Sequence, residues 1–450
     1  MAVSLGTSKR SACSRRASRT TTTACATASS ARVAVVPIAT TGRPGPVVVA
    51  LPEDVLSGVT AALPLTGPAR IAEPSPDPAA LSDALALLAQ AQRPAILLGG
   101  CNWTAAGRAA LQSFAEASDI PVVAALRYQD MIDNHSPVYA GDLGLGLTAG
   151  VRATLAEADV VLALNTRFGE ISTEGYTLFA VPTPAQKIIH VHASSLEIGK
   201  VYIPTLGIPA GPNAFAAALT PVKGAWSDWR KRARAAYQAT FDLPPQPSPV
   251  DMGQVMAHLQ SILPAGAILT NGAGNFTAWP NKYFRFGPHA RLLAPQSGAM
   301  GYGLPAAIAA KVAYPDRTVV CFAGDGDIQM NLPELGTAMQ AGAQPIVLIL
   351  NNGMYGTIRA HQERHFPTRV SGTTLVNPDF SALARAYGFH AERVSATADF
   401  PAAFARALAS KTGAVLDLDI SPEALTPRQT LSQMRSKALA EKDRAEKETK

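Results

Sequence analysis

The chain has 450 residues, 47% of them hydrophobic and 16% charged, a balance that is typical of two or three α/β domains and excludes a disordered or fibrous protein. No apolar run approaches the roughly 20 residues that span a membrane, and the four cysteines show no spacing that indicates a zinc site or a disulfide framework. The net charge of +6 is accounted for by the six Lys and Arg residues within positions 1–33, so it indicates no nucleic-acid surface on the folded body.

Residues 1–32 differ in composition from the rest of the chain. Ser, Thr, Ala and Arg dominate them without apolar periodicity, and we expect the stretch to be disordered. Three interpretations are open: an organellar transit peptide in residues 1–31, a nucleic-acid-binding tail, or a truncated or frame-shifted start. Without a transit peptide, we expect the protein in the reducing cytoplasm, with neither membrane nor nucleic acid as a partner.

Residues 79–220 predict a Rossmann-like domain. Residues 33–78 before them combine two β-runs, a Gly-Arg-Pro-Gly-Pro turn and a Pro- and Ala-rich linker, and are interpreted as the end of a preceding domain. The domain itself alternates helical patterns with buried apolar runs, which is typical of a parallel sheet. The expected strands are 94–98, 122–123, 160–164 and 187–192, and the expected helices are 80–92, 107–118 and a stretch ending at 156.

Two features of this domain invite a ligand interpretation. Gly99-Gly100 follows a strand, but there is no G-x-G-x-x-G and no acidic partner at the expected distance, so a helix-packing turn is favoured over a dinucleotide site. A nicotinamide-dependent dehydrogenase is therefore the least favoured alternative function. His190 and His192 alternate on a strand without a third ligand type nearby, and we expect core or surface residues rather than metal ligands.

A helix and a Pro-rich linker at 221–249 lead to a third domain at 250–425, followed by a charged tail at 426–450. Within the third domain, apolar runs at 267–270, 319–322, 345–350 and 414–418 predict strands, and the second and third of these runs predict neighbouring parallel strands. One ends at Gly324-Asp325-Gly326 and the next, 345–350, ends at Asn351-Asn352-Gly353. Because ligands bind at the carboxyl ends of parallel strands, acidic and amide oxygens meet there. Such hard donors suit Mg²⁺ together with phosphate oxygens and water.

The pattern GDG followed one helix and one strand later by NN resembles the thiamine-diphosphate-binding motif. The flanking sequence from Ser297, SGAMGYGLPAA, and the Rossmann-like domain upstream strengthen the likeness. The chain resembles the acetolactate synthase-like branch of the thiamine-diphosphate enzymes from about Val33 to Ser421. This resemblance implies two doubly wound parallel-sheet domains, a middle one and a diphosphate-binding one, and a homo-oligomer, dimer or tetramer.

The resemblance also implies roles for individual residues. Asp325 and Asn352, with the carbonyl of Met354, would bind Mg²⁺. Met300 would hold the cofactor in its bent shape, the carbonyl of Gly298 would accept from the aminopyrimidine, and backbone groups at Gly326 and Asp327 would help to hold the diphosphate. Asn351 is interpreted as a turn former, and Met300 could alternatively be core packing. The implied cofactor contacts are Gly272, Asn275, Gly298, Met300, Gly324, Gly326, Asp327, Gly356 and Thr357.

The implied chemistry is decarboxylation of a 2-keto acid and transfer of the remaining fragment to an acceptor. In the family, a glutamate of an N-terminal pyrimidine-binding domain assists the cofactor, and no residue of this chain can be assigned to it. We therefore expect this polypeptide alone to bind the cofactor weakly and not to turn over. A non-catalytic remnant or subunit that binds thiamine diphosphate is the alternative.

Two details bear on the substrate and on a second cofactor. Where acetolactate synthases have a tryptophan shortly after the NN pair, this chain has His361. His361 is a tentative acid–base residue, or else a surface histidine beside Arg359, Glu363 and Arg364. For FAD, which true acetolactate synthases bind, the sequence has no decisive signature, and Arg167 is the only candidate contact.

Overall fold

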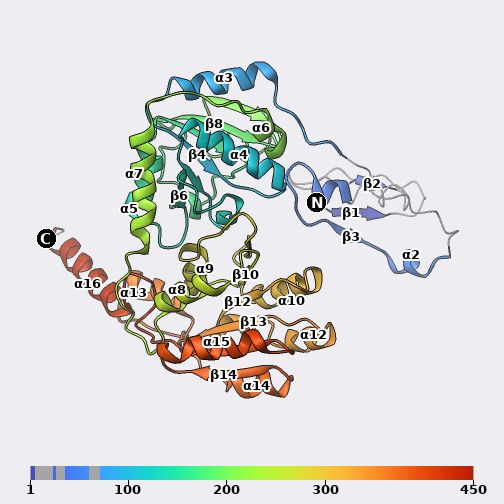
Figure 1. Cartoon of the computed structure of the whole chain (residues 1–450), viewed down its shortest axis with the longest axis vertical. Coiled ribbons are helices and arrows are strands. Elements are labelled where there is room, and N and C mark those ends of the chain that lie inside the picture. The colour runs from blue at the N-terminus through green and yellow to red at the C-terminus, as the bar shows by residue number, and fades with distance from the viewer. Residues whose placement is uncertain (1, 6–23, 27–35, 60–70, 449–450) are drawn as a thin grey trace.

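The structure is a computed structural model that describes residues 2–5, 24–26, 36–59 and 71–448. Figure 1 shows two layered α/β bodies, one above the other, with the N-terminal segment beside them. Most of residues 1–32, for which disorder is expected, lie outside the described residues. The described pieces β1 (Ala2–Leu5) and β2 (Ala24–Ala26) form a parallel sheet with β3 (Val48–Ala50), and α2 (Glu53–Ser57) follows.

The middle domain is built on a sheet of six parallel strands in the order β6-β5-β4-β7-β8-β9. These are β4 (Pro94–Leu98), β5 (Val122–Ala124), β6 (Tyr139–Asp142), β7 (Val160–Leu164), β8 (Lys187–His192) and β9 (Leu206–Pro209). Helices α3 (Pro78–Ala89), α4 (Ala105–Ser118) and α6 (Pro212–Ala218) pack on one face, and α5 (Ala149–Ala156) and α7 (Ser227–Gln238) pack on the other.

Alternation along the strands explains the two layers. In β4, Ile96 and Leu98 belong to the core of one face, whereas Ala95 and Leu97 belong to the core of the other. Both faces are buried, which is why the central strands are continuously apolar rather than alternating. His190 and His192 on β8 are buried within this domain, and burial lowers the pKa of His190 to about 4.

The second body has the same architecture, with six parallel strands in the order β11-β10-β12-β13-β15-β14. These are β10 (Ile268–Asn271), β11 (Arg291–Leu293), β12 (Val319–Gly324), β13 (Ile346–Asn351), β14 (His390–Val394) and β15 (Ala414–Asp419). Helices α8 (Met252–Ile262), α9 (Ala278–Lys282) and α15 (Phe400–Ala409) cover one face, and α10 (Gly303–Ala313), α12 (Glu334–Gln340) and α14 (Phe380–Ala386) cover the other. The predicted fold class is thus confirmed.

The remaining helices are short or peripheral. The predicted turn at Gly324-Asp325-Gly326 is different in the structure: β12 continues through Gly324, and Asp325 begins a short helix, α11 (Asp325–Ile328). Helix α13 (Gly356–His365) packs against the last helix, α16 (Leu431–Glu448). The 3₁₀ turns are η1 (Gln129–Met131), η2 (Ile171–Thr173), η3 (Ala239–Phe241), η4 (Asn275–Thr277) and η5 (Thr397–Asp399). Within the described ranges, no helix combines the length and the apolar character needed to cross a membrane.

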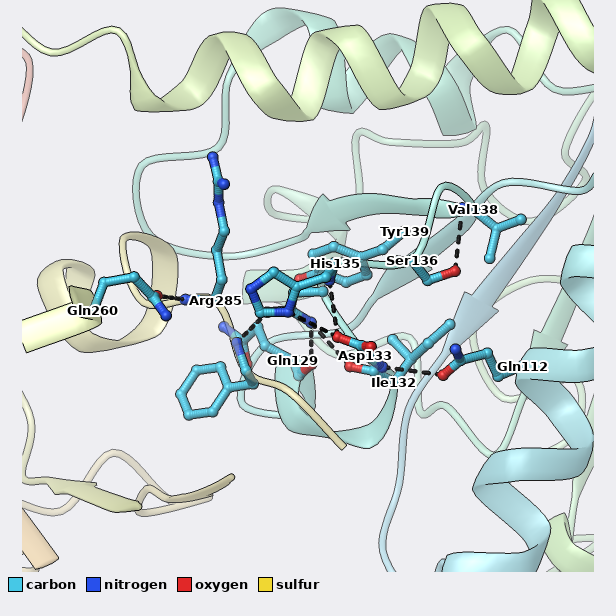
Figure 2. A network of polar contacts seen from close by, with 12 residues as sticks. Gln112, Gln129, Ile132, Asp133, His135, Ser136, Val138, Tyr139, Gln260 and Arg285 are labelled. Carbon is cyan, nitrogen blue, oxygen red and sulfur yellow. Dashed lines mark hydrogen bonds and ion pairs between the residues drawn. The ribbon is translucent and has the colours of Figure 1, made fainter. Parts of the chain in front are cut away.

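Buried polar contacts join the two domains along a seam between residues 127–142 and residues 282–298. The Lys282 ammonium lies 3.0 Å from Oδ2 of Asp142, and both side chains are buried. Asn134 donates its backbone N–H to the carbonyl of Phe286 at 2.8 Å and accepts from the N–H of Phe286 at 3.0 Å. Figure 2 shows this part of the seam, including Gln129 and His135 of the middle domain and the contact of the Arg285 N–H with Gln260 at 2.7 Å. The N–H of Leu292 donates to Oδ2 of Asp130 at 3.2 Å, so the seam holds strand β11 against the middle domain.

Candidate active site

A cleft opens at the carboxyl ends of β10, β12 and β13. From β10 the polypeptide continues to β11 on one side of the sheet, and from β12 it continues to β13 on the other side. The cleft between β10 and β12 therefore lies at the switch point of the sheet, where open α/β sheets bind ligands. The predicted residues Asn275, Met300, Gly324, Asp325, Gly326, Asp327, Asn352, Met354, Gly356 and Thr357 all line this one cleft, together with Ile420 and Leu425. The sheet topology therefore brings together segments that are far apart in sequence.

Asp325 is the only acidic side chain of the predicted metal-ligand set, and it is 2% exposed. Its Oδ2 accepts from the backbone N–H of Gly353 at 2.8 Å and from the amide of Asn377 at 2.7 Å, while Oδ1 accepts from the N–H of Gly326 at 3.0 Å. Burial raises the pKa of Asp325, and these hydrogen bonds to the charged form oppose that increase. The carboxylate is thus held in one orientation at the start of α11.

Asn377 was not singled out from the sequence. It precedes α14, and its amide donates to Asp325 and, at 2.9 Å, to Oδ1 of Asn351. Asn351 in turn donates to Oδ1 of Asp417 at 3.1 Å. Asn351, expected only to form a turn, therefore links two buried carboxyl groups through two amides. No local pattern in the sequence marks Asn377. An antiparallel bridge between Thr374 and Met354, with the N–H of Leu375 donating to the carbonyl of Gly353 at 2.8 Å, brings its segment next to Asp325.

The turn after β13 places the other two predicted metal ligands. Oδ1 of Asn352 accepts from the N–H of Met354 at 3.2 Å, and Gly353 between them donates to Asp325. The turn after β13 therefore carries an amide oxygen and a backbone carbonyl, and the start of α11 carries a carboxylate. These are three hard oxygen donors. The described residues contain no group of three or more His, Cys, Asp or Glu residues suited to a metal. This set fits a Mg²⁺ that takes few protein ligands and completes its shell with phosphate and water.

The opposite wall of the cleft supplies hydrogen-bond donors. Thr357 accepts the N–H of Asn275 at 2.9 Å and donates its hydroxyl to Oδ1 of Asn275 at 3.0 Å, which fixes the orientation of this amide. The Nδ2 of Asn275 is buried and has no partner in the protein. An unpaired buried donor is costly, so it indicates an acceptor supplied by a ligand. Asn275 and Thr357 therefore fit the predicted diphosphate contact.

Asp327 has a side-chain function in the structure beyond the backbone role expected of it. Its Oδ1 accepts from the N–H of Ala273 at 3.0 Å and of Gly301 at 2.8 Å. A Cβ on Gly272 would lie 2.0 Å from this oxygen, which explains why glycine precedes Ala273. Burial raises the pKa of Asp327 to about 6. The carboxyl thus connects the loop after β10 with the glycine-rich loop before α10.

Three predicted residues are not among the described residues that line the cleft. Gly272 lies behind it, against Asp327. Gly298 is exposed, with a φ of 70°, on the loop that leads to Met300. His361 is exposed on α13, where its ring stacks on His365 with centroids 5.9 Å apart. The contacts of His361 are therefore those of a surface residue.

A second cleft lies at the switch point of the middle domain, between the ends of β4 and β7. Gly100, Asn165 and Arg167 line it, and Arg43 from the N-terminal segment reaches into it. The buried carboxylate of Glu197 pairs with Arg43 and lies 3.6 Å from both Arg167 and Lys200. Arg43 and Arg167 thus face this cleft together with the carboxylate of Glu73, so groups of both charges line it.

Comparison with known proteins agrees with this geometry. The family model of the thiamine pyrophosphate enzyme C-terminal TPP binding domain matches residues 272–418, and that of the thiamine pyrophosphate enzyme central domain matches residues 81–219. The acetolactate synthase of Arthrospira platensis is 30% identical over 408 residues, which cover 85% of this chain and 69% of that protein. The chain belongs to the thiamine pyrophosphate enzymes.

Other relatives from this family carry similar names. The acetolactate synthase large subunit of Parasynechococcus marenigrum is 31% identical over 85% of this chain, and the acetolactate synthase isozyme 2 large subunit of Escherichia coli is 30% identical over 80% of it. The chain spans 64% and 65% of the lengths of these two relatives. Membership of the thiamine pyrophosphate enzymes confirms the predicted family and gives no support to a nicotinamide-dependent dehydrogenase.

Proposed function

We propose that this chain binds thiamine diphosphate with Mg²⁺ and serves the decarboxylation and carboligation of 2-keto acids. The observation that carries the proposal is the cleft itself, with the oxygen donors of Asp325, Asn352 and Met354 on one side and the unpaired Nδ2 of Asn275 on the other. When bound, the cofactor supplies an electron sink for loss of carbon dioxide.

The protein's part in this function is binding and orientation. Asp325, Asn352 and the Met354 carbonyl would hold the metal, and Asn275 with the backbone at Gly326 and Asp327 would hold the diphosphate. Leu350, Ile420 and Leu425 line the apolar side of the cleft and limit the access of water to it. Gly326 leaves room for this arrangement, since a Cβ there would lie 2.5 Å from the Tyr355 ring.

Calorimetric titration tests the binding step. Thiamine diphosphate added with Mg²⁺ should bind the purified chain with a one-to-one stoichiometry, whereas binding without Mg²⁺ or with the Asp325→Ala variant should be at least tenfold weaker. Thiamine without phosphate serves as the ligand control. Equal binding of Asp325→Ala and the unaltered chain would refute the metal assignment, and no binding by the unaltered chain would refute the proposal.

Turnover is measured separately, because a non-catalytic binding protein would give the same titration. Release of carbon dioxide from pyruvate, the simplest probe 2-keto acid, is followed with the purified chain and cofactor. The prediction that the chain alone does not turn over is contradicted by a steady rate. His361→Ala tests the tentative acid–base role, and its exposure leads us to expect an unchanged rate in any assay where turnover occurs.

We further propose that the second cleft is the place for FAD, if the chain binds it, with Arg167 and Arg43 toward the phosphates. A flavin titration followed by absorbance, repeated with Arg167→Ala, tests this assignment. The homo-oligomer and the cytoplasmic location stay predictions, and sedimentation of the purified chain tests the first of them.

A further inference from the structure

A chain of hydrogen bonds runs away from the cleft behind Asp325. We define the Asn377 chain as Asp325, Asn377, Asn351 and Asp417, linked by contacts of 2.7, 2.9 and 3.1 Å in that order. Its members come from the start of α11, the loop before α14, the end of β13 and the middle of β15. The chain of hydrogen bonds therefore connects four segments of the domain that are far apart in sequence.

The carboxylates at its two ends fix the orientation of both amides. An ionised carboxylate only accepts hydrogen bonds, so the NH₂ group of Asn377 has to face Asp325, and that of Asn351 has to face Asp417. The second proton on Asn377 Nδ2 then meets Oδ1 of Asn351, and Oδ1 of Asn377 accepts from Gln329 at 3.2 Å. Every polar atom of the Asn377 side chain is used, and a flipped amide would break these contacts.

The orientation of the Asn377 amide makes the two oxygens of Asp325 unequal in the hydrogen bonds that they accept. Oδ2 already accepts two hydrogen bonds, from Gly353 and Asn377, whereas Oδ1 accepts only from the adjacent N–H of Gly326. The capacity left on this carboxylate is therefore mainly on Oδ1.

We infer that Asn377, supported by Asn351 and Asp417, is a positioning residue that orients the carboxylate of Asp325 for the metal. Asn377 is separated from the GDG and NN motifs in sequence and touches the site only through Asp325 and Asn351. This inference rests on the proposed function, because it concerns the same metal site. It adds to that function a residue whose contribution is orientation rather than a bond to the metal.

The test measures the Mg²⁺ concentration that gives half-maximal thiamine diphosphate binding. Asn377→Ala removes the amide and leaves all three proposed ligands in place, so half-saturation should require at least tenfold more Mg²⁺, with full binding restored at excess Mg²⁺. Rescue by excess metal distinguishes positioning from a structural role, which would reduce the amount of binding protein without shifting the midpoint.

Two further variants complete the design. Gln344→Leu is the control, because it removes an exposed amide that donates to the backbone carbonyl of Lys411 at 2.6 Å, just before β13 begins, and contacts none of the proposed ligands. It should leave the Mg²⁺ midpoint unchanged. Asn377→Ser keeps one donor and should show an intermediate shift of about threefold, an order-of-magnitude expectation for one of two hydrogen bonds retained.

An unchanged midpoint in Asn377→Ala overturns the inference. So does loss of folding in both Asn377 variants, judged by circular dichroism, because the amide would then serve the fold rather than the site. Failure of the unaltered chain to bind thiamine diphosphate with Mg²⁺ instead refutes the proposed function, so the two failures are distinguishable.

Discussion

At the residue scale, the geometry of the cleft depends on the close approach of a carboxyl group to a glycine. The carboxyl of Asp327 occupies the space beside Gly272, and its Oδ1 holds the N–H groups of Ala273 and Gly301. Residue 272 is thus a glycine because a side chain there would collide with Asp327. Residue 327 is an acid because its carboxylate accepts two backbone hydrogen bonds. Both keep two loops that line the cleft at a fixed separation.

Gly272→Ala should therefore displace Asp327. The new Cβ would lie 2.0 Å from Oδ1, and the two N–H groups would lose their acceptor. Because unsatisfied buried groups cost about 1–3 kcal/mol each, we expect a lower free energy of unfolding by a similar amount and weaker thiamine diphosphate binding. Urea denaturation and calorimetry measure the two effects. Gly287→Ala, where a Cβ meets nothing within 4 Å, is the control, and equal loss in both variants would contradict the steric argument.

Asp130 predicts a pH dependence at the seam between the domains. Its Oδ2 accepts from the N–H of Leu292 at 3.2 Å, its Oδ1 is buried without a partner, and burial raises its pKa from 3.8 to about 6. A carboxyl whose pKa is raised in the folded state contributes stability below about pH 4, and that contribution is lost as the pH rises through about 6.

Asp130→Asn removes this titration. Relative to the variant, the unaltered chain should lose about 2–3 kcal/mol of unfolding free energy between pH 4 and pH 7, a rough value from a shift of two pKa units. Urea denaturation across this range measures the difference. Asp228→Asn, whose side chain is 99% exposed, controls for loss of a surface charge. A difference that does not change with pH would contradict the prediction.

At the element scale, the last helix is anchored by one buried carboxylate. Glu363 on α13 is 0% exposed, and Arg435 of α16 donates to its two oxygens at 2.8 and 2.6 Å. Arg359 adds a contact of 2.9 Å, and these guanidinium donors lower the pKa of Glu363 to about 2. Leu431 and Met434 of α16 pack beside Met354, so the anchor lies next to the turn that follows β13.

Arg435→Ala should release α16 from α13. Removing one partner leaves a buried charge with half its donors, which costs about 3 kcal/mol or more, and the helix should become accessible to limited proteolysis. Lys437→Ala is the control, because Lys437 makes only an exposed pair with Glu441 at 3.8 Å. Equal cleavage of both variants would show that Glu363 is not the anchor.

At the scale of the whole molecule, the two domains meet through the buried pair of Lys282 and Asp142. Lys282 also donates to the backbone carbonyl of Asp142 at 3.3 Å, and Gln129 donates to its carboxylate at the same distance. The pair joins the end of β6 to the end of α9, that is, one sheet system to the other. Its loss should therefore affect how the domains unfold together.

Lys282→Met should leave Asp142 buried without its cation, at a cost of about 3–5 kcal/mol. We expect calorimetric unfolding to separate into two transitions, because the middle and cofactor-binding domains each have their own core. Lys231→Met, which breaks an exposed pair, should keep the original transition pattern. A single transition at a lower temperature would indicate a destabilised but undivided unit.

In the two six-stranded sheets, the strands that the sequence did not predict are β6, β9, β11 and β14, which are the edge strands of these sheets. The predicted strands lie inside the sheets, where burial on both faces requires continuous apolar runs. An edge strand pairs on one side only, so sequences such as Leu-Gly-Ile-Pro in β9 can serve. The apolar pattern of the sequence therefore predicts the inner strands of each six-stranded sheet and not its edge strands.

The sequence by itself determined the fold class and the family and indicated the candidate metal ligands, because these depend on local patterns: apolar runs that end at GDG and NN, and glycines before an Ala-rich helix. Only the tertiary structure decided which residues support them. Asn377, Asp417 and the side-chain role of Asp327 depend on which strand ends become neighbours, and the anchor at Glu363 depends on where the last helix packs. Such contacts join positions far apart in the chain, and no spacing in the sequence encodes them.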